Sequence, residues 1–161
     1  MVGRLGEGEE NMSDTNGLPV SLQMPGHLVR RLHQLSTQLF TQRVQQTGSD
    51  LTPIQFAALD ALRAMDGIDQ AGLAAAIAKD RATIGAVVDR LEQKGLIARR
   101  PSPRDKRAKV LSLTEQGQAV LAELVPVVDA LQRDSLPGLS DAEYRQFLAL
   151  ATKAVAAAER E

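Results

Sequence analysis

Apolar side chains recur along most of this chain at the three- and four-residue spacing of an amphipathic helix. The clearest case begins at Asp80, a candidate N-cap, and ends before Gly95, which can adopt the left-handed conformation that closes a helix. One stripe of this helix is apolar and consists of Ile84, Val87, Val88 and Leu91. The opposite face holds small residues and an arginine, so we expect it to approach a binding partner closely.

Helices are also predicted before this segment. A long helix over about residues 25–47 has an apolar arc wide enough for two contacts, one within the subunit and one with a partner subunit. Thr52 and Gln55, with a proline between them, predict a capping box that opens a second helix. Asp69 is expected to cap a third helix of about eight to ten residues, and Ile68 could form one short strand.

Two further helices are predicted at the end of the chain. Thr114 begins one that runs to about residue 134. Pro126 lies inside it and is expected to kink it or loosen one turn, because proline lacks the N–H donor. Ser140 and Glu143 predict a second capping box. The residues expected to form the buried face of the last helix are Tyr144, Phe147, Leu148, Ala151 and Val155.

A basic β-hairpin follows the Asp80 helix directly. Residues 96–100 and 107–113 are predicted strands, and residues 101–105 form the turn. The short third helix, a turn and the Asp80 helix are typical of a helix-turn-helix, and a cationic hairpin after them is typical of a wing. We therefore predict a mainly α fold with a small β-hairpin wing. The hairpin holds Arg99, Arg100, Arg104, Lys106, Arg107 and Lys109 against the single acid Asp105.

The net charge of −1 hides a segregated pattern. Residues 79–109 contain ten Lys or Arg and four Asp or Glu, a net charge of +6. The rest of the chain contains nine basic and sixteen acidic residues, a net charge of −7. A basic patch on an acidic body is typical of a surface that binds a polyanion.

Composition argues against several other classes of protein. Aromatic residues make up 2% of the chain and tryptophan is absent, which favours packed helices over a β-sandwich. The absence of cysteine excludes disulfides and thiolate chemistry, and two histidines do not favour a zinc site. No nucleophile–base pair, phosphate loop or carboxylate pair occurs at a spacing typical of an active site. We therefore expect that the protein is not an enzyme and binds no cofactor or metal. Without a membrane-spanning apolar run or a secretory signal, the protein is expected in the cytoplasm, associated with the nucleoid.

The segment from Asp80 to Gly117 resembles the winged-helix core of the MarR family of bacterial transcription regulators, and the resemblance extends over about residues 25–158. The first helix, LVRRLHQLSTQLFTQRV, resembles that of the nicotinate-degradation repressors within this family. The matching segments of the core are Asp89-Arg90-Leu91-Glu92, Gly95-Leu96-Ile97, Asp105-Lys106-Arg107 and Leu113-Thr114-Glu115-Gln116-Gly117.

The resemblance implies a homodimer in which the first, fifth and sixth helices of both subunits intertwine. Many such proteins repress operons and release DNA when a small aromatic acid or phenol binds between the dimer region and the winged helix. We expect residues 1–20 to be a disordered tail, because they are too polar to bury surface, and residues 21–161 to be a single domain. Its DNA-binding part would be residues 48–113, and its helical dimerisation part residues 21–47 and 114–161.

Candidate DNA contacts lie on the Asp80 helix. Small or hydroxylated side chains let the backbone approach base edges, and an arginine can reach a guanine or a phosphate. The alternative is a solvent-facing amphipathic helix, which the adjoining wing makes less favoured. The candidate residues are Arg81, Ala82, Thr83, Gly85, Ala86 and Arg90.

The wing supplies a second set of candidates, although some of its cations could simply be solvated. Arg107 resembles the minor-groove arginine of the family, and we expect Asp105 to pair with Arg107 and fix its direction. Asp89 would repel DNA if unpaired, so it is interpreted as a structural partner of a wing arginine such as Arg99. The predicted DNA contacts of the wing are Arg104, Lys106, Arg107 and Lys109.

A carboxylate effector would need an arginine or a histidine in a half-buried place. The first helix offers both, although a histidine on an apolar face is more often a core or interface residue. The candidate ligand-binding residues are His27, Arg31, His33, Ser36, Phe40 and Phe56.

Together these features favour a homodimeric repressor that binds a pseudo-palindromic double-stranded DNA operator and is released by a small aromatic acid or phenol, with a nicotinate-type compound as one candidate. The alternative is a winged helix that binds proteins without DNA, which the segregated basic patch disfavours.

Overall fold

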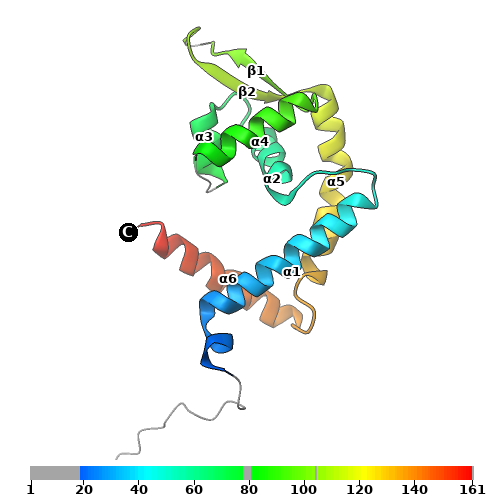
Figure 1. The fold of residues 1–161 in the computed structure, drawn as a ribbon, viewed down its shortest axis with the longest axis vertical. Coiled ribbons are helices and arrows are strands. Elements are labelled where there is room, and N and C mark those ends of the chain that lie inside the picture. The colour runs from blue at the N-terminus through cyan, green and yellow to red at the C-terminus, as the bar shows by residue number, and fades with distance from the viewer. Residues whose placement is uncertain (1–18, 78–80, 104, 161) are drawn as a thin grey trace, which may run out of the picture. The chain divides into compact units, whose positions relative to one another are not determined.

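The computed structural model describes residues 19–77, 81–103 and 105–160 (Figure 1). The candidate cap Asp80, the wing residue Arg104, the side chain of Arg81 and most of the predicted tail lie outside the described residues. The chain divides into two units, residues 1–34 and 35–161, each of which is described by itself.

The first unit contains a short 3-10 helix, η1 (Val20–Gln23), and the first part of α1 (Pro25–Gln45). Its apolar side chains are largely exposed, with Leu28 at 50% and Val29 at 65%. Only Phe40 and Val44, near the end of α1, are buried. The predicted apolar arc is therefore covered at one end only. None of the helices in the described ranges is long and apolar enough to cross a membrane.

The second unit begins with the end of α1 and continues through three helices, of which the first two start at local caps. Thr52 Oγ1 accepts a hydrogen bond from the Gln55 N–H, and the Gln55 side chain accepts one from the Thr52 N–H, which confirms the predicted capping box. Asp69 accepts from the Gly72 N–H at 2.7 Å and caps the next helix, which is slightly shorter than expected. These helices are α2 (Pro53–Ala64), α3 (Gln70–Ala76) and α4 (Arg81–Gln93).

The core of this unit lies where α2, α3 and α4 meet the hairpin and α5 (Glu115–Asp134). The apolar stripe predicted for α4 is buried, with Ile84, Val88 and Leu91 completely covered. Gly95 adopts a φ of +71° and ends α4 as expected. The other fully buried large side chains are Val44, Leu59, Leu62, Leu73, Ile97, Leu111, Leu121 and Leu124.

The predicted wing is an antiparallel hairpin of β1 (Ile97–Pro101) and β2 (Lys109–Leu113), in which Ile97 pairs with Leu113 and Pro101 with Lys109. Ile68 does not form the expected strand. It nevertheless contacts the hairpin, because the Leu111 N–H donates to the Ile68 carbonyl at 2.8 Å. A single such residue cannot build a strand, but it ties the loop before α3 to β2.

Two long helices end the chain, α5 (Glu115–Asp134) and α6 (Asp141–Ala158). α5 continues through Pro126, and Ser140 with Glu143 forms the predicted capping box of α6. The expected buried face of α6 is wrong for the single chain, because no residue of this helix is buried. Phe147 is 36% exposed, Leu148 45% and Val155 57%. At one end of this face the Arg133 guanidinium of α5 lies 4.4 Å from the centre of the Tyr144 ring, and the large apolar side chains beyond it remain uncovered.

Candidate nucleic-acid interface

The outer face of α4 presents small side chains to solvent. Ala82, Thr83 and Ala86 are exposed, and Arg90 follows them one turn later on the same face. Gly85 is partly buried, and a Cβ built there would meet only the flexible Gln70 amide at 3.4 Å, an ordinary contact. Packing within the chain therefore does not require glycine at this position. A face of this kind lets a helix backbone come close to the edges of base pairs in a major groove.

Arg99 connects this helix to the wing. Its guanidinium, on β1, forms ion pairs with both Asp89 and Glu92 of α4, and its side chain is 24% exposed. The hydrogen bond that Arg99 donates to Asp89, with a smaller contribution from the charge of Glu92, raises the pKa of Arg99 above its ordinary value. The expected Asp89–Arg99 contact is present, and Glu92 is an additional partner. Two carboxylates beside the exposed face of α4 are thus paired with one cation, which cancels half of their charge and also fixes the base of the wing.

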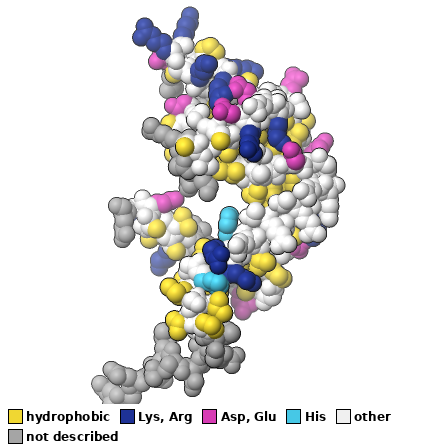
Figure 2. Space-filling view, viewed as in Figure 1, with side chains coloured by type: hydrophobic (Ala, Val, Ile, Leu, Met, Phe, Trp, Pro, Cys, Tyr) yellow, Lys and Arg dark blue, Asp and Glu magenta, His cyan; other side chains and the backbone are white. Residues whose placement is uncertain are grey.

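The tip of the wing is cationic and exposed. Lys106, Arg107 and Lys109 are all exposed, and Figure 2 shows basic side chains gathered at the hairpin end of the molecule. The expected pairing of Asp105 with Arg107 is made through the backbone and not through the guanidinium. Asp105 Oδ1 accepts from the backbone N–H of Arg107 at 2.9 Å, and no ion pair among the described residues joins the two side chains. Asp105 therefore shapes the turn and leaves the guanidinium of Arg107 available to an anion.

The predicted ligand-binding residues fall into both units. His27 is partly buried, whereas Arg31 and His33 are exposed, and all three belong to the first unit. In the second unit, Phe40 is 5% exposed and its ring centroid lies 5.8 Å from that of Phe56, in an edge-to-face contact. The two rings thus pack on each other, and Ser36 is partly buried nearby in the sequence of α1. The ligand role of these six residues stays a prediction.

Sequence reasoning missed a cavity of about 490 Å³ between the end of α2, the end of β2 and α5. Its walls are mostly apolar, and Arg63 and Gln118 add hydrogen-bond donors. Arg63 pairs with Asp60 at 2.8 Å and remains 61% exposed. Three segments far apart in the sequence form this cavity. The one signal in the sequence that could have indicated it is Arg63, an arginine at the end of an apolar helix. The lining residues are Leu62, Arg63, Asp66, Leu113, Gln118, Leu121, Ala122 and Val125.

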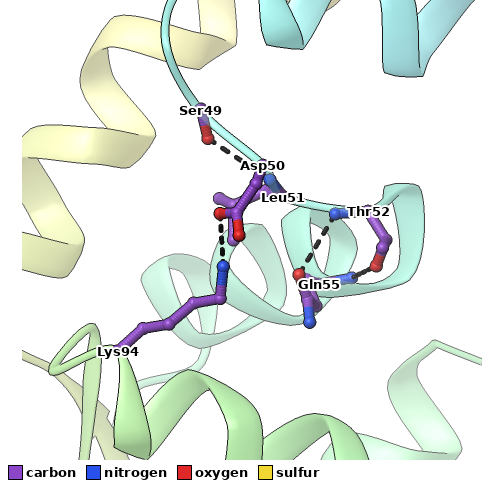
Figure 3. Close-up of polar contacts among 6 residues, drawn as sticks. All are labelled: Ser49, Asp50, Leu51, Thr52, Gln55 and Lys94. Atoms are coloured by element: carbon purple, nitrogen blue, oxygen red, sulfur yellow. Dashed lines mark hydrogen bonds and ion pairs between the residues drawn. The ribbon is translucent and has the colours of Figure 1, made fainter.

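A second polar contact joins the loop after α1 to the end of α4. Figure 3 shows the Lys94 ammonium reaching the Asp50 carboxylate, beside the Thr52–Gln55 capping box. The hydrogen bond from Lys94, followed by its positive charge, lowers the pKa of Asp50 from its ordinary value. The Asp50 side chain is 83% exposed, so solvent screens the pair and its contribution to stability is small.

The Asp50–Lys94 pair predicts a pH-dependent effect of the Lys94→Met substitution. Because the pKa of Asp50 is lower in the folded state, the pair stabilises the fold above the ordinary carboxyl pKa and loses this effect as pH falls through the folded-state pKa. The variant should melt about 1–2 °C below the wild type at neutral pH. The two melting curves should converge in acid. A Lys153→Met variant, which removes an exposed lysine of α6, is the control. A difference in Tm that is constant with pH would contradict the assignment.

Comparison with known proteins places the fold in a family. A family model described as the MarR family matches residues 49–108. The chain is 37% identical over 130 residues to the HTH-type transcriptional repressor NicR of Pseudomonas putida, and the match covers 81% of each chain. The chain belongs to the MarR family.

Solved structures of MarR-family proteins agree with this assignment. BpsR of Bordetella bronchiseptica, whose DNA binding is regulated by 6-hydroxynicotinic acid, matches with a TM-score of 0.78 and 32% identity, over 83% of this chain and 94% of that chain. A point mutant of Escherichia coli MarR, solved with operator DNA, matches with a TM-score of 0.75 and 26% identity, over 84% and 94%. The predicted family and the mainly α fold with a β-hairpin are confirmed, and the similarity to NicR and BpsR agrees with the predicted branch. These relatives are transcriptional regulators and not enzymes.

Proposed function

We propose that this MarR-family chain acts as a homodimeric, sequence-specific repressor of transcription whose hold on DNA is released by a small aromatic acid. The observation that carries the proposal is the exposed small-residue face of α4, held by Arg99 against a wing with exposed cations. In this arrangement α4 reads base edges, whereas the wing supplies phosphate contacts and places Arg107 in a minor groove.

The dimer would use the helices outside the DNA-binding part, residues 21–47 and 114–161. The exposed apolar side chains of α1 and α6 support this division, because large apolar groups left in water by one chain are typical of a surface that a second copy covers. Two copies of α4 about one helical turn apart would then read a pseudo-palindromic operator.

The effector would enter the cavity beside α5. A volume of about 490 Å³ with apolar walls suits an aromatic ring, and Arg63 could exchange Asp60 for the carboxylate of the ligand. The regulation of BpsR by 6-hydroxynicotinic acid makes pyridine carboxylates the first compounds to test. The residues predicted in α1 and α2, His27, Arg31, His33, Ser36, Phe40 and Phe56, are the alternative set of contacts.

DNA binding by the full chain is the direct test of this function. Footprinting on the intergenic DNA upstream of its own gene should protect a pseudo-palindrome. The affinity should fall steeply between about 50 and 200 mM salt, because binding releases counterions. Light scattering should give the mass of a dimer. Absence of any protection at low salt would reject the proposal and favour the protein-binding alternative.

The Arg63→Met substitution tests the effector site. Ligand at about one hundred times its Kd should stabilise the wild type by about 2.7 kcal/mol, so a thermal-shift panel of 6-hydroxynicotinate, nicotinate and benzoate should raise its Tm. The variant should lose most of this rise, because the carboxylate then lacks its cation. Arg145→Met, an exposed arginine of α6, is the matched control. An unchanged shift in the Arg63 variant, together with its loss in His33→Ala, would transfer the site to α1.

A further inference from the structure

The segment from Leu113 to Gly117 joins β2 to the first turn of α5. In the structure Thr114 stands between β2 and α5, and its hydroxyl makes two hydrogen bonds. It donates to the carbonyl of Gly95 at 2.6 Å and accepts from the N–H of Gly117 at 3.0 Å. The second bond is the N-cap of α5, whereas the first reaches back to the turn that ends α4.

Backbone contacts reinforce this connection. The Thr114 N–H donates to the Leu96 carbonyl at 3.1 Å. Gly117 is buried against the same carbonyl, and a Cβ built on Gly117 would lie 1.9 Å from the Leu96 oxygen. No other residue type could keep the first turn of α5 this close to the base of the wing. We name Gly95, Leu96, Thr114 and Gly117 the Thr114 joint.

We propose that the Thr114 joint sets the half-site spacing that the dimer accepts, by fixing the angle between α5 and the DNA-reading unit of α4 and the wing. The inference rests on the proposed function, because spacing has a meaning only for a dimer on DNA. Thr114 is a positioning residue, since it acts through Gly95 and the backbone and contacts no DNA itself.

Because α5 is long, a small change in its angle at the Thr114 joint moves its far end by several ångströms. A helix of 20 residues is about 30 Å long, so a tilt of about 6° at one end moves the other end by about 3 Å. That displacement is close to the rise of about 3.4 Å per base pair of DNA. A joint that slackens by a few degrees would therefore supply the axial part of the shift to a half-site one base pair further away, and twist of the DNA would supply the accompanying turn of about 36°.

The test compares the operator with a copy that carries one extra base pair between its half-sites. Thr114→Val removes the hydroxyl and keeps the shape, and Thr114→Ser keeps the hydroxyl. Thr52→Val is the matched control, because Thr52 caps α2 through the N–H of Gln55 without bonding another element. Thr114→Val and Thr52→Val should both lower Tm by about 3 °C.

The preference for the correct spacing should separate these variants. Wild type, Thr114→Ser and Thr52→Val should bind the correct spacing about thirtyfold more tightly than the longer one. Thr114→Val should reduce this preference to about fivefold or less. Gly117→Ala should reduce the spacing preference even more, but the clash with Leu96 could prevent folding. Thr114→Val is therefore the decisive variant.

Two outcomes would overturn the inference in distinguishable ways. A wild type that prefers one spacing, with Thr114→Val keeping the same preference at a lowered Tm, would show that Thr114 only stabilises the fold. A wild type that binds neither duplex would overturn the proposed function, and the role of the joint with it.

Discussion

Replacing Ala86 with glutamate is expected to weaken operator binding at least about a hundredfold, a loss of about 2.7 kcal/mol, while Tm stays within about 1 °C of the wild type. Ala86 is exposed on the face of α4 that lies in the groove in the proposed complex. Glutamate is a good helix former, so the free protein should tolerate it. In the complex, however, the new carboxylate would meet phosphates and acceptor groups of bases with little water between them, and such like-charge contacts cost several kcal/mol.

Fluorescence anisotropy at fixed salt would measure the loss, and circular dichroism would confirm the fold. Ala119→Glu is the matched control, because it adds the same charge to an exposed position in the second turn of α5. It should cost less than about threefold, since its charge acts from a distance through screening salt. Equal losses in both variants would mean that net charge alone decides binding and that α4 is not the reading face. An unchanged Ala86→Glu variant would instead favour a winged helix that binds proteins.

Interactions within a few residues of sequence were predictable. The capping boxes at Thr52 and Ser140 and the cap at Asp69 each join groups three residues apart, so the sequence contains both partners and their spacing. The apolar stripe of α4 was equally local, because helical periodicity alone brings Ile84 and Val88 to one face.

The sequence predicts less well those contacts that depend on the direction of a side chain or on residues far apart in the chain. Asp105 and Arg107 are two residues apart, and the sequence could not decide whether the carboxylate would meet the side chain or the backbone N–H; it meets the backbone. The cavity lined by Arg63 and Gln118 requires α2 and α5 to be placed side by side, which periodicity does not determine.

The last helix shows a different limit. The apolar residues of α6 were recognised, but periodicity indicates that a face is to be covered and not which chain covers it. In the structure of one chain Phe147 and Val155 remain exposed. A helix that is amphipathic yet exposed in its own chain is what a dimerisation element would show, which is why this error is consistent with the proposed dimer.

Replacing Arg99 with methionine is expected to weaken operator binding about thirtyfold, a loss of about 2 kcal/mol. Methionine fills similar space but leaves Asp89 and Glu92 without their cation. Both carboxylates would then repel the phosphates that α4 approaches, and the wing would lose charge-assisted hydrogen bonds worth about 1.5–3 kcal/mol each. The neighbouring Arg100 is exposed on the same strand, so Arg100→Met is the control, with an expected loss of about threefold from the removal of one positive charge near the DNA.

A combined variant separates the two roles of Arg99. Adding Asp89→Asn and Glu92→Gln to Arg99→Met removes the repulsion but does not restore the ion pairs that hold the wing. Operator affinity should therefore recover to within about fivefold of the wild type, because the freed wing still costs binding entropy when it is ordered on DNA. Recovery to the wild-type value would make neutralisation of Asp89 and Glu92 the whole role of Arg99. If affinity does not recover, attachment of the wing is the main role of Arg99. If Arg99→Met and Arg100→Met lose the same affinity, both roles are refuted, and α4 and the wing contact DNA independently.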